Sequence, residues 1–387
     1  MNTESKPMYK WKDIPWRKLE RMVFKLQRRI YQASRCGNVA LVHRLQKLLT
    51  KSWSAKAIAV RRVTQENKGK KTAGVDGVKS LSPAARLKLI DKLKLGSKVK
   101  PTRRVWIPKP GTKEERPLGI PTMYDRALQA LVKMALEPEW AARFEPNSYL
   151  RRGSSNRGFR PGRGCHDAIV AIFNSIRSKP KFVLDADIAK CFDQINHRKL
   201  LEKLNTSPTL RKQIRGWLKS GVMDGKELFP TDKGTPQGGV ISPLLANIAL
   251  HGMEEEIKSL SEHFDMKRSD GKYQLPKRDK RNSISLIRYA DDLVILHESE
   301  EAIHRCHQVI AEWLKVMGLE LKPSKTRIAH TLESYRGEEK GFDFLGFHIR
   351  QYRAGKCRSG KDSRGNQLGF KTQISTYKNL KRNTTLR

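Results

Sequence analysis

The sequence is poor in cysteine, has few acidic residues and contains no long apolar run. No apolar stretch reaches membrane-spanning length, and the polar N-terminus MNTESKPMYK is not typical of a signal peptide. The cysteines form no CxxC pair and are odd in number: Cys36, Cys165, Cys191, Cys306 and Cys357. We interpret them as reduced thiols. These features predict a cytoplasmic protein with no membrane partner.

Acidic residues are outnumbered two to one. The 387 residues include 79 Lys and Arg against 39 Asp and Glu, for a formal net charge of +40. With this net charge the basic residues repel one another in the compact state, and polyanionic partners are favoured. Nucleic acid is the leading candidate. A ribosomal-type structural protein can be equally basic, so the charge predicts binding and leaves the chemistry open. The length allows one large domain or two to three smaller ones.

The first 70 residues are basic and helical by period. They hold 18 Lys and Arg against 4 Asp and Glu. Apolar residues recur at three- and four-residue steps from Leu19 to Ala33, which predicts a helix. Asn38 is a candidate N-cap for a second helix, and a third runs from about Trp53 to Val63. We expect an RNA-facing surface here; the alternative is a solvated basic face on a small helical unit.

Strand and helix patterns alternate from about residue 100 to 350, which predicts an α+β domain with a largely antiparallel sheet. Residues 261–282 form a polar insert that we interpret as a surface loop. The chain from 350 onward is basic again, with 11 Lys and Arg against one Asp. The expected strands are 103–108, 181–188, 286–289 and 293–298, and the expected helices are 124–136, 166–178 and 302–317.

Two acidic clusters follow apolar strands. Asp291 and Asp292 lie in LIRYADDLVIL (286–296), and Asp187 lies in VLDADIAKCFDQINH (183–197). Adjacent acids are ordinary at a solvated turn. If the three carboxylates meet, however, they raise one another's pKa unless cations bind between them. Two Mg²⁺ ions held by carboxylates can activate a 3′-hydroxyl and stabilise leaving pyrophosphate, which is nucleotidyl transfer.

These clusters belong to an ordered series of motifs. In chain order the series is RRVWIPKPGTKEERPLGIPT (103–122), GFRPGRG (158–164), VLDADIAKCFDQI (183–195), GTPQGGVISPLLANIAL (234–250), IRYADDLVIL (287–296), GLELKPSKTRI (318–328) and FDFLGFHI (342–349). From about residue 10 to 350 the chain closely resembles the reverse transcriptases encoded by bacterial group II introns. The resemblance includes the stretch VRRVTQENKGKKTAGVDG (60–77) that ends the N-terminal extension.

The resemblance implies a right-hand polymerase with fingers and an antiparallel palm sheet. We expect a basic helical N-terminal reverse transcriptase extension at 1–80, fingers and palm at 81–350, and a basic tail at 351–387 as a remnant of the thumb or maturase region. Only 40 residues follow Phe347, too few for three helices of ordinary length. The thumb is therefore expected to be missing or vestigial, in a truncated or naturally short form.

The same resemblance assigns residues to the chemistry. Asp187, Asp291 and Asp292 match the metal-binding aspartates of the palm, which would hold two Mg²⁺ ions. Lys325 matches a lysine proposed to protonate leaving pyrophosphate. Asp193 is expected to cap or pair locally and is not counted as a metal ligand.

Further positions match residues that contact substrates. Lys109 and Arg116 match basic finger residues that grip the incoming deoxynucleoside triphosphate, and Gln237 matches a residue beside the nascent base pair. The segment FLGF (344–347) matches a primer-gripping hairpin. Phe192 matches an aromatic ring that would collide with a ribose 2′-hydroxyl, which favours deoxynucleotides and disfavours an RNA-dependent RNA polymerase.

One insertion departs from the family pattern: LRRGSSNR (150–157) interrupts a junction that is continuous in relatives. This insertion and the expected lack of a thumb leave two functional classes open; the aspartates favour the first and the missing thumb favours the second. The first is an RNA-directed DNA polymerase that copies group II intron RNA from a DNA primer or target. The second is an RNA-binding, maturase-like remnant without useful polymerase activity.

Overall fold

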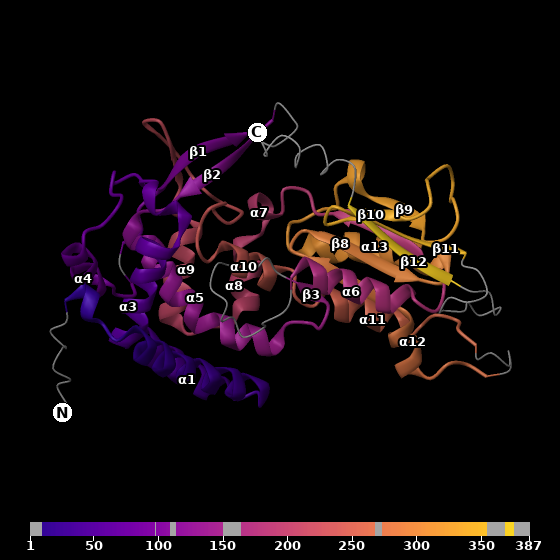
Figure 1. Ribbon diagram of the computed structural model, residues 1–387, viewed down its shortest axis with the longest axis horizontal. Helices are drawn as coiled ribbons and strands as arrows, with labels where there is room; N and C mark the ends of the chain where they lie inside the picture. Colours follow the sequence, from indigo (N-terminus) through magenta and orange to yellow (C-terminus); the bar gives the residue numbers. More distant parts are fainter. Residues whose placement is uncertain are drawn as a thin grey trace. The chain divides into compact units, whose positions relative to one another are not determined.

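The computed structural model describes residues 10–96, 98–108, 114–149, 164–267, 273–353 and 368–374 (Figure 1). For Lys68 and for 368–374 only the backbone is described. The described residues divide into two compact units, which we treat separately. The first unit contains 10–144 and 192–249, and the second contains 145–149, 164–191 and the described residues from 250 onward. In the described ranges no helix has the length and apolar character needed to cross a bilayer.

Helices dominate the N-terminal part of the first unit, as the periodicity predicted. They are α1 (Trp16–Arg35), α2 (Val39–Lys51), α3 (Trp53–Arg61) and α5 (Met123–Arg143), with a π-helical turn at Arg62–Glu66. Asn38 caps α2 by accepting a hydrogen bond from the Leu41 N–H, which confirms that prediction. Helix α1 buries Leu19, Val23 and Ile30 and packs along α5.

Helix α5 runs past the predicted end at Leu136, because another helix compensates for Pro138. A proline inside a helix leaves the carbonyl four residues earlier without its usual donor, and here that carbonyl belongs to Met134. The Gln27 side chain of α1 donates to the Met134 carbonyl at 2.8 Å. The Met134 carbonyl thus keeps a donor, and the helix continues to Arg143.

The first unit also contains a four-stranded sheet in the order β2-β1-β5-β6. Strands β1 and β2 form an antiparallel hairpin, and β5 runs parallel to β1. The strands are β1 (Thr102–Pro108), β2 (Glu115–Ile120), β5 (Val222–Asp224) and β6 (Glu227–Phe229). The remaining helices are η1 (Trp11–Asp13), η3 (Lys68–Lys71), α4 (Pro83–Lys92), α7 (Cys191–Gln194, which begins in the second unit), α8 (His197–Leu204), α9 (Pro208–Leu218) and α10 (Ser242–Ala249).

A five-stranded sheet in the order β3-β7-β8-β4-β9 forms the centre of the second unit. All neighbours pair antiparallel except β3 with β7, which confirms the largely antiparallel sheet. A second sheet has the order β10-β11-β12. The strands are β3 (Ser148–Tyr149), β4 (Phe182–Asp187), β7 (Ser285–Tyr289), β8 (Asp292–His297), β9 (Arg327–His330), β10 (Phe342–Phe344), β11 (Phe347–Arg353) and β12 (Leu368–Ile374).

Each face of the five-stranded sheet has its own cover. Val183, Ile287 and Val294 share one face and pack with α6 and with β10 and β11. Helices α11 and α13 pack on β7 and β8 as well. The ring centroids of Phe264, just after α11, and of His297 lie 5.5 Å apart, which assigns α11 to the opposite face. The helices are α6 (Cys165–Ile176), α11 (Met253–Ser261), α12 (Lys277–Ser283), α13 (Glu300–Val316) and η4 (Pro323–Lys325).

The prediction of a loop across 261–282 was wrong in part, because Lys277–Ser283 forms α12. This helix buries no residue, so its sequence has no apolar period. Ion pairs to α11 and the turn after it hold it instead: Arg281 contacts Glu255 at 2.7 Å and Glu262 at 2.8 Å. Residues 268–272 of the insert lie outside the described residues.

Candidate active site

Strands β4 and β8 place two of the predicted carboxylates opposite each other. Their antiparallel register pairs Asp187 with Asp292 at the ends of the two strands. Side chains of paired residues point to the same face of a sheet. The apolar runs that form the strands therefore bring these two acids together, as expected from the sequence.

Asp291 lies in the tight turn between β7 and β8. Tyr289 pairs with Asp292, so Ala290 and Asp291 form a two-residue loop. Ala290 has φ +58°, a left-handed conformation that two-residue hairpin loops require and that alanine rarely adopts. The Asp291 carbonyl accepts a hydrogen bond from the Ile188 N–H at 3.1 Å. The turn is thereby tied to the residue that follows Asp187.

The three aspartates create a strongly negative site. Burial, followed by the charges of Asp291 and Asp187, raises the pKa of Asp292 from 3.8 to about 7. Lys325 Nζ lies 2.6 Å from Asp187 Oδ2, and this hydrogen bond raises the pKa of Lys325. One lysine therefore offsets part of the charge of three carboxylates.

The residues present fit a divalent cation. Within the described part of the chain, no three histidine, cysteine, aspartate or glutamate side chains are already gathered as a metal cluster. The half-buried Asp292 nevertheless carries a raised pKa, because burial and the charges of Asp291 and Asp187 outweigh the opposing charge of Lys325. Carboxylate oxygens are the ligands that hard cations such as Mg²⁺ prefer. The site thus has the right donors and an unmet need for positive charge.

Asp185 lies near these residues on β4 but has a different partner. Arg327 Nε contacts Asp185 Oδ2 at 3.2 Å, and the same guanidinium contacts Glu338 at 3.3 Å. Burial raises the pKa of Asp185 to about 6, against the lowering effect of Arg327. Asp185 is therefore paired with an arginine, whereas Asp187 lies opposite Asp292.

In the first unit, Gln237 is held by Asp193. The Gln237 side-chain amide donates to both carboxylate oxygens of Asp193 at 3.0 Å. The local pairing expected for Asp193 is thus confirmed. The Gln237 amide oxygen takes no part in this pairing. The Thr235 N–H donates to the Phe192 carbonyl at 2.6 Å, so the turn of Gln237 is fastened to the residue predicted to select the sugar.

Close packing explains the glycines of this turn. A Cβ on Gly234, whose φ is +82°, would lie 2.6 Å from the Asp193 carbonyl oxygen, and one on Gly238 would lie 2.9 Å from the Gly119 oxygen. At both positions the atoms that approach the glycine closely are those of the protein itself.

The remaining predicted residues are placed as follows. Arg116 is exposed on β2, paired with Ile107 of β1. Phe344 and Phe347 flank a two-residue loop whose residues both have positive φ, so FLGF forms a hairpin, and Phe344 is buried in the core. Lys109, the insertion 150–157 and 158–163 lie outside the described residues.

Sequence reasoning missed two charged residues close to the site. It assigned no role to Arg327, whose carboxylate partner on β4 becomes apparent only from the pairing of β4 with β9. It also assigned none to Arg288, a cation within the apolar run LIRYADD, which is 1% exposed. A charge in such a run indicates a buried partner.

Comparisons with known proteins agree with this geometry. Residues 107–349 match the family model "Reverse transcriptase (RNA-dependent DNA polymerase)", and residues 11–93 match "N-terminal domain of reverse transcriptase". The group II intron-encoded protein LtrA of Lactococcus lactis is 32% identical over 348 residues, which cover 76% of this chain and 55% of LtrA. The chain thus spans about half the length of that relative.

Two further relatives align over most of this chain. Protein YkfC of Escherichia coli is 31% identical over 363 residues, covering 86% of this chain and 90% of YkfC. Maturase-like protein 1 of Euglena gracilis is 26% identical over 352 residues, covering 88% of this chain and 65% of that protein. With the matched reverse transcriptase domain and the carboxylates paired across β4 and β8, the chain belongs to the group II intron reverse transcriptase/maturase family.

Proposed function

We propose that this protein is an RNA-directed DNA polymerase that copies group II intron RNA into cDNA. The observation that carries the proposal is the register of β4 and β8, which sets Asp187 opposite Asp292 with Asp291 in the adjoining turn. A carboxylate cluster at strand ends, beside a lysine and within a reverse transcriptase domain, suits transfer of a nucleotide to a primer 3′-hydroxyl. Members of this family use divalent metal ions.

Asp187, Asp291 and Asp292 would hold two Mg²⁺ ions. Bound there, the ions would lower the pKa of the primer hydroxyl and neutralise phosphate charge. The protein itself fixes the three carboxylates at the adjacent ends of β4 and β8 and in the turn before β8. Burial and then mutual repulsion raise the pKa of Asp292, so a bound cation would stabilise its charged form.

Lys325 is proposed to neutralise a carboxylate of this site and to donate a proton during the reaction. Its ammonium group pairs with Asp187 at 2.6 Å and keeps its proton because that contact raises its pKa. An ammonium group within reach of the site can move to the leaving pyrophosphate and donate a proton to it. Lys325 would thus exchange one anionic partner for another during the reaction.

Phe192, Gln237, Arg116 and Lys109 are proposed to select and hold the incoming nucleotide. Phe192 and Gln237 belong to one hydrogen-bonded assembly of the first unit through Thr235 and Asp193. Arg116 is exposed on the β1–β2 hairpin, where a guanidinium can reach phosphate oxygens. Sugar exclusion by Phe192 and base contact by Gln237 would therefore depend on each other.

The net charge of +40 supports a second candidate, RNA binding without polymerisation. Binding through phosphate contacts predicts that log affinity falls linearly with log salt. This candidate shares the RNA partner with the first but needs no catalytic aspartate. The two functions therefore separate at the active site.

Primer extension is the deciding experiment. Purified protein, an RNA template, a DNA primer, deoxynucleotides and Mg²⁺ should yield cDNA. Asp291→Asn should abolish it while RNA affinity stays within about twofold, because a carboxylate donates no hydrogen bond to RNA phosphates. Asp279→Asn, an exposed acid on α12, is the matched control and should extend normally. RNA binding without extension by the wild type would favour the second candidate, and full activity of Asp291→Asn would remove the catalytic assignment.

A further inference from the structure

Arg288 is a buried cation on the α11 side of the active-site sheet. It is 1% exposed and lies on β7, three residues before Asp291. In the hairpin register Tyr289 pairs with Asp292, whereas Arg288 pairs with Leu293. Because side chains alternate along a strand, Arg288 points away from the face that carries Asp187 and Asp292. It therefore lies beneath the catalytic edge and cannot touch substrate there.

The guanidinium group holds the backbone of the catalytic turn. Arg288 Nη1 donates to the Ala290 carbonyl at 3.2 Å, and Nη2 donates to Ser148 Oγ of β3 at 2.7 Å. The Ala290 N–H donates to the Tyr149 carbonyl at 3.3 Å. Both main-chain polar groups of Ala290 are thus fixed, although the left-handed φ of this residue disfavours its conformation.

Two carboxylates behind the sheet compensate the charge of Arg288. Burial lowers the pKa of Arg288, and the negative charges of Glu145 and Glu254 oppose that shift. Burial alone would raise the pKa of Glu145, but the contact with His251, the charge of Arg288 and backbone N–H groups hold it below its ordinary value. A guanidinium without such counter-charges would be expensive to bury.

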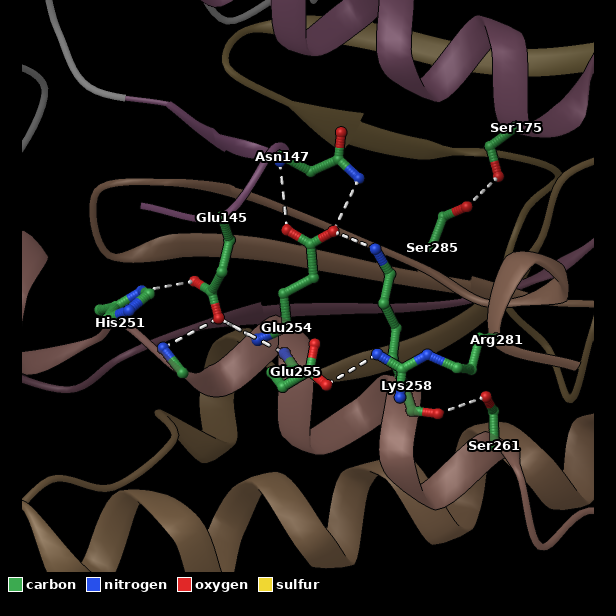
Figure 2. Close-up of polar contacts among 11 residues, drawn as sticks. Glu145, Asn147, Ser175, His251, Glu254, Glu255, Lys258, Ser261, Arg281 and Ser285 are labelled. Carbon is green, nitrogen blue, oxygen red and sulfur yellow. Dashed lines mark hydrogen bonds and ion pairs between the residues drawn. The ribbon is translucent and has the colours of Figure 1, made fainter. Parts of the chain in front are cut away.

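Figure 2 shows how these two carboxylates are held. The carboxylate of Glu145 lies beside the N-terminus of α11. It accepts hydrogen bonds from the N–H groups of Gly252 at 2.8 Å and Glu254 at 2.9 Å. The Glu254 side chain accepts from Asn147 at 3.1 Å and from Lys258 at 2.7 Å. Both carboxylates are therefore fixed in place, and they present a fixed negative field to the cation.

We infer that Arg288 is a positioning residue for the nucleotidyl-transfer reaction: it clamps the Ala290 carbonyl from below and so fixes Asp291 and Asp292. The inference rests on the proposed polymerase function for its catalytic consequence. Its structural part, the rigidity of the turn, does not. Displacement of a reacting group by about 1 Å can cost on the order of 100-fold in rate, so a clamp on this turn matters even though it touches no substrate.

Two pairs of variants test the inference. Arg288→Met removes the clamp, and Lys181→Met is its control, since Lys181 is a 6%-exposed cation of the same unit that donates to the Ser283 carbonyl. Ser148→Ala removes one acceptor of Arg288. Its control is Ser285→Ala. This variant removes the hydrogen bond between Ser175 and Ser285, which lies on β7, the strand of Arg288. The serine pair keeps the inference testable if the buried-cation variants fold poorly.

Hydrogen–deuterium exchange gives the structural readout and primer extension the catalytic one. Arg288→Met, and to a lesser degree Ser148→Ala, should speed exchange of the Ala290 amide by about tenfold or more while β4 stays protected. The turnover number should fall by about 10–100-fold with the KM for deoxynucleotide and the RNA affinity unchanged. The two controls should alter neither the Ala290 amide nor turnover.

The outcomes separate the two proposals. Unchanged exchange at Ala290 in both Arg288→Met and Ser148→Ala would overturn the clamp. Equal loosening in the controls would do the same, because the effect would then be general destabilisation. A wild type that extends no primer would refute the polymerase proposal, while exchange at Ala290 would still decide whether Arg288 fixes the turn.

Discussion

Lys325 Nζ and Asp187 Oδ2 lie 2.6 Å apart, although the two residues are separated by 138 positions in the chain. Lys325 follows Pro323 in the short helix η4. The Lys322 N–H donates to the Asp187 carbonyl at 2.8 Å, which brings the segment of η4 to the end of β4. The lysine therefore occupies one of the oxygens that a metal ion would need.

Replacing Lys325 should move metal affinity and turnover in opposite directions. Lys325→Met frees Asp187 and removes a competing positive charge, so Mn²⁺, measured by electron paramagnetic resonance, should bind about two- to tenfold more tightly. Turnover should fall by roughly 10–100-fold if the ammonium group donates a proton. Lys322→Met is the control, because Lys322 contacts Asp187 through its backbone N–H. Weaker Mn²⁺ binding by Lys325→Met would argue against competition at this oxygen.

Asp292 predicts an unusual pH dependence for the metal-free protein. Its pKa is about 7 in the folded state against an ordinary value of 3.8, so between these values the folded state binds more protons than the unfolded state. Stability should then fall as pH rises from about 4 to 7. With a chelator present, Asp292→Asn should unfold near the wild-type denaturant midpoint at pH 4 and be more stable by about 2–4 kcal/mol at pH 8. A constant difference across this range would contradict the raised pKa.

Phe192 should determine the sugar preference of the incoming nucleotide. Phe192→Val opens space for a 2′-hydroxyl and should lower the preference for deoxynucleotides over ribonucleotides by roughly 100-fold, which corresponds to about 2.7 kcal/mol. Phe229→Val, which trims another aromatic ring of the first unit, is the control. The measurement is the ratio of incorporation efficiencies. An unchanged ratio with a lowered melting temperature would mean that Phe192 is only a packing residue.

Gly234 offers a direct test of the turn that carries Gln237. Gly234→Ala adds a methyl group 2.6 Å from the Asp193 carbonyl oxygen at a residue with φ +82°. Gly225→Ala also has a positive φ, +60°, but meets nothing within 4 Å among the described residues. The control should lose about 1 kcal/mol of unfolding free energy from the backbone alone. Gly234→Ala should lose about 2–3 kcal/mol more and should weaken deoxynucleotide binding. Equal losses would show that the turn can shift without cost.

The sequence allowed prediction of the strands and of the acids that end them, because apolar runs mark buried strands. It could not settle which residues oppose each other. Asp185 and Asp187 point to the same face of β4, and only the register with β8 and β9 shows that one pairs with Asp292 while the other meets Arg327. Pairing between distant strands is a property of tertiary structure, to which local pattern gives no access.

Elements that are stabilised by ion pairs could not be predicted from the sequence either. Helix α12 buries no side chain, so no periodicity marks it, and its ion pairs come from Glu255 and Glu262 on another segment. Arg288 likewise depends on partners from other segments: besides the nearby Ala290 carbonyl, they are Ser148 and two distant carboxylates. The sequence shows the charge itself, whereas its partners become visible only in the folded chain.

The order of strands in the central sheet constrains how the protein can be made on the ribosome. Strand β4 lies between β8 and β9, both of which are synthesised more than a hundred residues later. The intervening 192–249 belongs to the other compact unit. Nascent β4 must therefore wait without a partner, its apolar residues exposed, while a separate unit is completed. We expect ribosome-stalled chains that end before β8 to recruit chaperones and to be cut by protease within 164–191. Stalled chains that include β9 should resist the protease. Resistance of the shorter chains would show that other residues cover β4 before β8 and β9 are made.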